Sequence, residues 1–85
     1  MIVRSARDIG AAARDARLRR GWSQTQLADA IGATRQWVTM FENGKTTVEL
    51  GLVLRALAAL GIAVDTVPAP PATTGVDLDE LLGEF

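Results

Sequence analysis

Residues 5–20 have the alternation of apolar and polar positions that is typical of an amphipathic helix. Ser5 is a favourable N-cap residue, and Asp8 follows it three positions later, as in many helix starts. The pattern runs to about Arg20 and stops at Gly21, a residue that commonly ends helices. Four residues form the predicted inward face: Ile9, Ala12, Ala13 and Ala16.

Two shorter helices are predicted next. Ser23 and Gln26 have the spacing of a capping box, so the first of them starts at Ser23 and reaches Gly32. Thr34 is the predicted N-cap of the second, which ends near Asn43. Because the connection between them is so short, the two helices must cross at a sharp angle.

A fourth helix is predicted from Thr46 to Leu60, because Thr46 and Glu49 again resemble a capping box and Gly61 follows the last apolar position. Its apolar stripe consists of Leu50, Val53, Leu54, Leu57 and Leu60. Three more apolar residues lie off this stripe: Leu52, Ala56 and Ala59. The helix is thus more apolar than a surface helix of a monomer should be, and a buried subunit interface would explain this.

Residues 62–67 are rich in β-branched side chains and predict a short strand. A single strand has two unpaired edges and is not stable alone. It must pair either with residues 1–4 or with the same strand of a second copy, and we favour the second copy. In such a homodimer the interface residues would be Ile62, Val64 and Thr66.

The remainder of the chain is predicted to lie outside the folded domain. Residues 68–75 form a Pro-rich linker, and residues 77–85 are acidic with apolar side chains at helical spacing. These side chains are Leu78, Leu81, Leu82 and Phe85. Nine residues are too few for a stable isolated helix, so this tail would need a partner. The predicted fold is mainly α, with four to five helices and the short strand in one domain over residues 1–67, followed by a linker and tail over residues 68–85.

Composition excludes several classes of protein. The 85 residues suffice for one small domain, and the absence of cysteine and histidine excludes a disulfide framework and the usual zinc sites. There is no Gly-rich phosphate loop, no nucleophile paired with a base and no calcium-loop spacing, so we expect no enzymatic activity, metal or cofactor. No apolar run approaches the roughly 20 residues of a membrane span and no segment resembles a signal peptide, so we expect a cytoplasmic protein without a membrane partner.

The net charge of −1 conceals an asymmetry along the chain. Residues 1–45 carry eight basic and four acidic side chains, whereas residues 46–85 carry one basic and six acidic ones. A basic first half suits contact with DNA on one side of the domain. Since charges in a short chain also scatter unevenly by chance, this asymmetry supports a DNA-binding function only together with a motif.

Residues 21–45 contain three positions with the spacing of a helix-turn-helix. Ala28 is small where two helices would cross, Gly32 tolerates a positive φ in the turn, and Val38 can pack the second helix onto the first. The helix that follows Thr34 is therefore predicted to be a recognition helix that enters the major groove of DNA.

The polar side chains of this helix suit the recognition of bases. Arg35 can bind guanine and Gln36 can bind adenine through paired hydrogen bonds, with Thr34 and Thr39 as secondary base contacts. We expect Trp37 to pack at the edge of the core rather than to read a base. Phosphate contacts are predicted for Ser23, Gln24, Asn43 and Lys45. Such side chains could merely solvate an exposed helix, so the prediction depends on the helix-turn-helix spacing.

Residues 8–60 resemble the lambda-repressor-like (XRE) helix-turn-helix family, most clearly in the stretches SQTQLADAIG and FENGK. In that family an arginine of the first helix commonly pairs with the glutamate that ends the third. The resemblance therefore implies an ion pair between Arg17 and Glu42 inside the domain. It also places Gln24, Arg35 and Asn43, together with Gln36, at positions that the family uses to contact DNA.

The chain as a whole resembles antitoxins of the Hip (high-persistence) type, by its length, the stretches GWSQ and FEN, the strand after the fourth helix and an acidic tail with an aromatic end. The resemblance implies a homodimer that represses its own operon at a palindromic operator and binds a serine/threonine kinase toxin. Toxin contacts would come from Leu78, Leu82 and Phe85 of the tail. The Pro-rich linker and the final Gly-Glu-Phe differ from that pattern, and the alternative is a stand-alone XRE regulator without a toxin partner.

Overall fold

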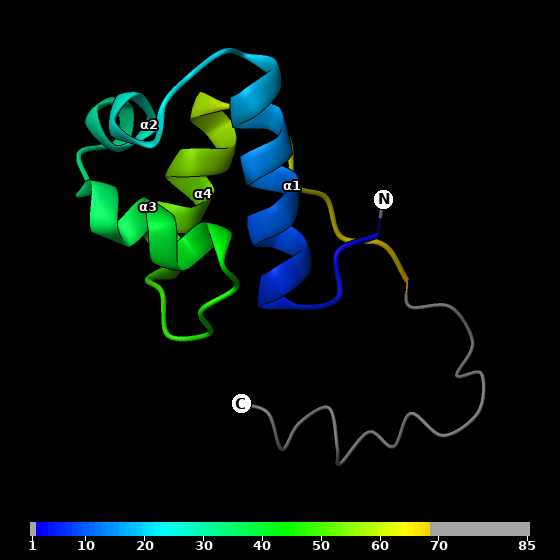
Figure 1. The fold of residues 1–85 in the computed structure, drawn as a ribbon. Helices are drawn as coiled ribbons and strands as arrows, with labels where there is room; N and C mark the ends of the chain where they lie inside the picture. Colours follow the sequence, from blue (N-terminus) through cyan, green and yellow to red (C-terminus); the bar gives the residue numbers. More distant parts are fainter. Residues whose placement is uncertain (1, 69–85) are drawn as a thin grey trace.

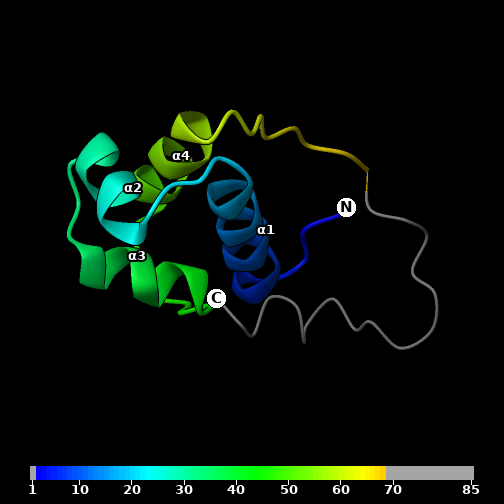
Figure 2. The same cartoon turned by 45° about the horizontal axis from the view of Figure 1, so that its top comes forward.

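The computed structural model describes residues 2–68 and contains four helices in that range. They are α1 (Ala6–Arg19), α2 (Gln24–Ile31), α3 (Arg35–Glu42) and α4 (Leu50–Ala59). Helix α3 packs against α1 and α2, and α2 also packs against α4. In Figure 1, α1 and α4 run side by side, while α2 and α3 lie together on the left of the molecule. Helix α3 lies along one edge of the domain (Figure 2), so one of its faces is open to solvent.

The starts of α1, α2 and α3 agree with the predicted caps. Ser5, Ser23 and Thr34 each have an extended backbone, and each side-chain oxygen accepts a hydrogen bond from the backbone N–H three residues later. These contacts satisfy backbone donors that have no partner within the helix. The short connection between α2 and α3 turns at Gly32, whose φ of 71° is in the left-handed region that glycine adopts without strain.

The core lies where α2, α3 and α4 meet. Its largest fully buried side chains are Leu27, Ile31, Val38, Phe41 and Leu57. Helix α1 contributes Ala13, which is completely buried, while the predicted Ile9 and Ala16 are partly buried against the same cluster. With few aromatic residues, the domain fills its centre with branched aliphatic side chains and alanines, which allow the helices to approach closely.

The start and the buried face of α4 differ from the prediction. The helix begins at Leu50 with Glu49 as N-cap, not at Thr46, and Glu49 makes no side-chain capping bond. Residues 46–49 form a loop instead, and this loop packs Val48 against the core. Ala56, predicted to lie off the apolar stripe, is fully buried, whereas Leu50 is 68% and Leu54 is 46% exposed. Val53, Leu57 and Leu60 of the predicted stripe are buried as expected, so the buried face of α4 keeps these three residues and gains Ala56 in place of Leu50 and Leu54.

Within residues 2–68, residues 62–67 are extended but form no strand. They pass close to the N-terminal residues 2–4 (Figure 1), and both segments line one shallow groove, yet no backbone hydrogen bond joins them in this range. A strand needs backbone hydrogen bonds to a neighbouring strand, so an extended segment without them does not form one. Ile62 is half-buried on the core of its own chain, whereas Val64 and Thr66 are exposed.

The predicted tail contacts Leu78, Leu82 and Phe85 lie outside the described residues. None of the helices described between residues 2 and 68 combines the length and the apolar character needed to cross a membrane. The same part of the chain holds no group of three carboxylate, histidine or cysteine side chains placed to bind a metal ion.

Candidate nucleic-acid interface

Helix α3 has a buried face and an exposed polar face. Val38 is fully buried and Phe41 is 1% exposed, and together they fasten the helix to the core. Trp37 stacks on Phe41 with ring centroids 5.2 Å apart, so its predicted packing role at the edge of the core is confirmed. The residues predicted for base contact at the start of the helix, Thr34, Arg35 and Gln36, are all exposed. They lie on neighbouring positions at the N-terminal end, which can approach a groove first.

The spacing that predicted a helix-turn-helix corresponds to the geometry of α2 and α3. Ala28 is 2% exposed at the crossing of the two helices, and Gly32 takes the positive φ of the turn. Arg55 of α4 then closes the end of α2, because its Nη1 donates a hydrogen bond to the carbonyl oxygen of Ile31 at 2.9 Å. This contact was not predicted, since it joins residues that are far apart in the sequence.

The front of α2 is held by a complete capping box. The Ser23 hydroxyl accepts from the Gln26 backbone N–H at 3.1 Å, and the Ser23 backbone N–H donates to Gln26 Oε1 at 2.7 Å. Ser23 is exposed and Gln24 is partly exposed at this end of the helix. The remaining predicted phosphate contacts, Asn43 and Lys45, are both exposed just after α3. The structure therefore brings the predicted phosphate contacts to the two ends of the α2–α3 pair.

A buried ion pair joins α1 to the end of α3. Arg17 Nε and Nη2 donate to Glu42 Oε2 and Oε1 at 2.6 and 3.0 Å, and Arg17 Nη1 donates to the Trp22 carbonyl oxygen at 2.8 Å. The side chains of Arg17 and Glu42 are only 7% and 1% exposed. The hydrogen bonds to Glu42 raise the pKa of the Arg17 guanidinium above its usual value, although desolvation by burial acts in the opposite direction. The pairing implied by the family resemblance is confirmed.

Two predicted DNA contacts, Gln24 and Thr39, are also partners in this internal network. Gln24 Nε2 donates to Glu42 Oε1 at 3.2 Å, and the Thr39 hydroxyl donates to Gln24 Oε1 at 3.0 Å. A continuous path of hydrogen bonds thus runs from α1 through the end of α3 to the start of α2 and back to the middle of α3. Sequence spacing could not reveal it, because the bonded residues are 15 to 25 positions apart.

Gly10 is a further residue whose role the pattern of apolar positions does not show. A Cβ atom at this position would lie 2.3 Å from the carbonyl oxygen of Phe41. Only glycine therefore allows α1 to approach the C-terminal end of α3 this closely. A glycine inside a helical pattern costs about 1 kcal/mol relative to alanine, and that local penalty is the signal that could have identified the contact.

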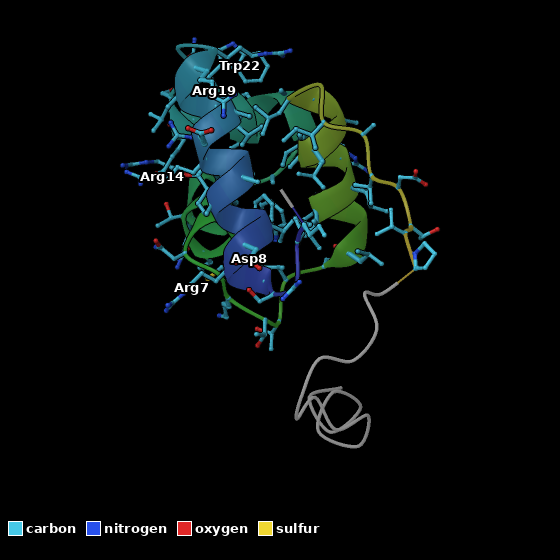
Figure 3. All side chains as sticks on the ribbon, turned by 90° about the vertical axis from the view of Figure 1, so that its right-hand side faces the viewer. Arg7, Asp8, Arg14, Arg19 and Trp22 are labelled. Carbon is cyan, nitrogen blue, oxygen red and sulfur yellow. The ribbon has the colours of Figure 1, made fainter. Side chains whose placement is uncertain are left out.

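Basic side chains also lie on the outer side of α1. Arg7 and Arg14 project from the same side of this helix into solvent (Figure 3). Arg20 instead packs over the ring of Trp22 at 4.9 Å and donates to the carbonyl oxygen of Ala59 at 2.6 Å. The basic residues of the first half are thus divided between exposed surface charges and structural contacts. The number of basic residues in residues 1–45 therefore overestimates the positive charge that is available to DNA.

Comparison with known proteins agrees with this geometry. Residues 8–69 match the sequence profile of the helix-turn-helix domain family. Over 63 residues the chain is 33% identical to an uncharacterized HTH-type transcriptional regulator, y4mF, from Sinorhizobium fredii, which covers 74% of this chain and 83% of that protein. It is 34% identical over 55 residues to a hypothetical transcription factor of Neisseria meningitidis, of which it covers about half (52%).

Solved structures with the same fold include a HipA–HipB–O2–O3 complex and a HipB–O4 20mer complex. Each superposes with a TM-score of 0.76 over 82% of this chain and 99% of the other chain. Their sequence identities are 23% and 24%, so the likeness is one of fold. The likeness covers nearly the whole of each matched chain rather than the helix-turn-helix alone.

Proposed function

The chain belongs to the helix-turn-helix domain family, and from this membership we propose that it is a transcriptional repressor that binds a palindromic operator as a homodimer. The observation that carries the proposal is the exposed polar start of α3, fixed on a rigid support by the Arg17–Glu42 pair. A recognition helix must present its side chains in one orientation to discriminate bases, and a mobile helix would lose that discrimination to entropy.

Each residue predicted to contact DNA has a proposed role. Arg35 and Gln36 read guanine and adenine in the major groove, and Thr34 lies beside them at the helix start. Thr39, one turn further along, was predicted as a second flanking contact. Four residues meet phosphates and set the register of the domain on the duplex: Ser23, Gln24, Asn43 and Lys45. In a two-fold dimer the two recognition helices lie about 34 Å apart, one turn of DNA, or a multiple of it.

The homodimer is supported by an apolar surface that a single chain leaves uncovered. Ile2, Ile9, Val64 and Val67 line a groove of about 730 Å³ between α1 and the two extended end segments. Ile2, Val64 and Val67 are 56%, 60% and 62% exposed. Exposed β-branched residues beside an unpaired extended segment are what pairing of residues 62–67 with the same residues of a second copy would cover.

Replacing Val64 with proline tests this dimer. Proline has no N–H and cannot donate to a ladder between subunits, so we expect the Val64→Pro chain to sediment as a monomer where the unmodified chain is a dimer. The helical circular dichroism should stay unchanged, because residue 64 lies after α4. A Val64→Ala chain, which keeps the N–H, is the matched control and should still dimerise. A dimer that persists in Val64→Pro would place the interface elsewhere.

We further propose that the chain is the antitoxin of a toxin–antitoxin module with a serine/threonine kinase toxin. The supports are the resemblance of the whole chain to Hip-type antitoxins and the fold shared with HipB along 82% of this chain. The apolar tail residues Leu78, Leu82 and Phe85 are the proposed toxin contacts. A stand-alone regulator that uses only the DNA-binding face is the alternative, and the two differ in whether a kinase co-purifies.

Affinity purification of the tagged chain from its host, with mass spectrometry, separates these alternatives. A stoichiometric kinase-like partner supports the antitoxin, whereas tight binding to the upstream DNA without any partner supports the stand-alone regulator. If a kinase co-purifies, a chain truncated after residue 70 should neutralise it less well than the full chain. Equal neutralisation would show that the tail is not the inhibitory contact.

A further inference from the structure

The hydroxyl of Thr39 is already engaged inside the protein. Thr39 is partly buried midway along α3, and its Oγ1 lies 3.0 Å from Gln24 Oε1 and 3.1 Å from the carbonyl oxygen of Arg35. A threonine hydroxyl has one proton, and both neighbours are acceptors, so that proton is shared between them. To donate to a DNA base, Thr39 would have to give up both contacts.

The same contacts fix the orientation of the Gln24 amide. Its Nε2 faces Glu42 Oε1 at 3.2 Å, and a carboxylate can only accept. Its Oε1 faces the Thr39 hydroxyl, which supplies a proton. If the amide were rotated by 180°, oxygen would face oxygen at Glu42 and the donated bond from Thr39 would be lost. The contacts of the Gln24 amide oxygen and of its nitrogen therefore favour the same orientation of the amide.

Glu42 makes this orientation a fixed one. Two nitrogen atoms of Arg17 hold its carboxylate, and its side chain is 1% exposed, so it cannot turn to follow Gln24. Gln24 Nε2 carries a second N–H, and none of the hydrogen bonds among residues 2–68 uses it. Gln24 is partly exposed, so this N–H can reach solvent or a ligand at the front of α2.

We propose that Thr39 is a positioning residue: it locks the Gln24 amide so that its second N–H is presented to a DNA phosphate. This replaces the base contact predicted for Thr39 from the helical pattern. The inference rests on the proposed function, since it takes a phosphate of the operator as the acceptor. Thr39 thus acts on affinity through Gln24 and leaves the choice of bases to Arg35 and Gln36.

The test compares two variants of the full chain that separate the hydroxyl from the methyl group. T39V keeps the shape of the side chain and removes the hydroxyl, whereas T39S keeps the hydroxyl. The probes are a fluorescein-labelled duplex of the DNA upstream of the chain's own gene and a scrambled duplex of the same composition. We expect T39V to weaken binding to both duplexes by about three- to tenfold for each half-site that a subunit occupies, the effect of one hydrogen bond per subunit, and T39S to bind like the unmodified chain.

A double-mutant cycle with Gln24→Ala decides between positioning and direct reading. If Thr39 acts through Gln24, T39V should cause no further loss in the Gln24→Ala chain. Additive losses, a changed base preference in T39V, or a loss in T39S as large as that in T39V would each overturn the proposal. The first two would indicate a base contact by the hydroxyl, and the last a contact by the methyl group.

Nuclear magnetic resonance of the free protein separates this inference from the proposed function. The side-chain amide of Gln24 should be rigid on the nanosecond timescale in the unmodified chain and in T39S, and mobile in T39V. Equal mobility in all three would refute the positioning role whatever the DNA results. If the amide is rigid as expected but no duplex is preferred, the proposed function fails while the internal contact stands.

Discussion

The Arg17→Met chain is expected to lose about 3–5 kcal/mol of its free energy of unfolding, because the substitution leaves the buried carboxylate of Glu42 without its cation. Methionine fills similar space, so the loss reports the charge and its hydrogen bonds rather than a cavity. For a domain of this size each kcal/mol lowers the melting temperature by about 4–8 °C, so the transition should fall by at least about 12 °C. Thermal and urea unfolding followed by circular dichroism measure both quantities.

A surface pair in the same helix provides the matched control. Arg19 also bonds to a carboxylate, that of Asp15, but these side chains are 76% and 58% exposed. Arg19→Met should therefore change the stability by less than about 1 kcal/mol. Equal losses in the two variants would mean that burial adds nothing to the Arg17–Glu42 pair. The double variant Arg17→Met with Glu42→Met removes both charges, and we expect it to recover a large part of the loss.

The pH dependence of this stabilisation follows from the raised pKa of Arg17. A cation whose pKa is higher in the folded state stabilises the fold fully below its usual pKa and loses that contribution only as pH rises through the folded-state pKa. The stabilisation by Arg17 is therefore fully present between about pH 6 and pH 9, and its titration adds no pH dependence in that range. A stability difference between the unmodified and Arg17→Met chains that varied strongly across this range would have to come from the titration of other groups.

Local features of the fold could be predicted from the sequence because neighbouring residues determine them. Ser5, Ser23 and Thr34 cap their helices through backbone N–H groups three residues away, and Gly32 turns the chain through its own φ. None of these interactions needs information from a distant part of the chain. The capping pattern at Thr46 did not predict the start of α4, which begins at Leu50 after a loop that packs Val48 against the core.

Features that depend on distant residues or on a second chain were not predictable in the same way. The hydrogen bonds from Gln24 to Thr39 and Glu42 form only when α2 crosses α3. From the sequence alone, Gln24 and Thr39 were therefore both predicted to contact DNA. The strand predicted over residues 62–67 is not formed in the described residues, where no backbone hydrogen bond joins this segment to residues 2–4. Its pairing with a second copy remains a proposal. The ion pair between Arg17 and Glu42 was accessible only through the family resemblance.

The internal hydrogen bonds of Gln24 and Thr39 change which of the predicted residues we expect to contact bases. Thr39 and Gln24 face each other inside the network, whereas Arg35 and Gln36 are exposed. The side chains that can adapt to bases are therefore concentrated in the first turn of α3. This turn is held through Thr34, whose hydroxyl accepts from the Trp37 backbone N–H at 3.0 Å. Discrimination of bases should consequently depend on very few side chains, with Arg35 first among them.

Replacing Arg35 with alanine should remove most of the preference for the operator. A bidentate arginine–guanine contact is worth about 1–3 kcal/mol of discrimination, and a dimer makes it in both half-sites, so operator affinity should fall by at least about thirtyfold. Affinity for a scrambled duplex should fall far less, since that complex loses only a mobile charge near the backbone. Competition binding with the upstream and scrambled duplexes, at one stated salt concentration, gives the ratio directly.

The Lys45→Ala chain is the matched control that distinguishes a base contact from a non-specific phosphate contact. Lys45 is exposed just after α3 and is proposed to meet a phosphate, so its loss should weaken both duplexes alike. The slope of log K against log salt should decrease by about one for each phosphate contact removed. If Arg35→Ala instead weakened both duplexes equally and reduced the salt slope, Arg35 would be a phosphate contact. Base reading would then have to depend on Gln36 and Thr34.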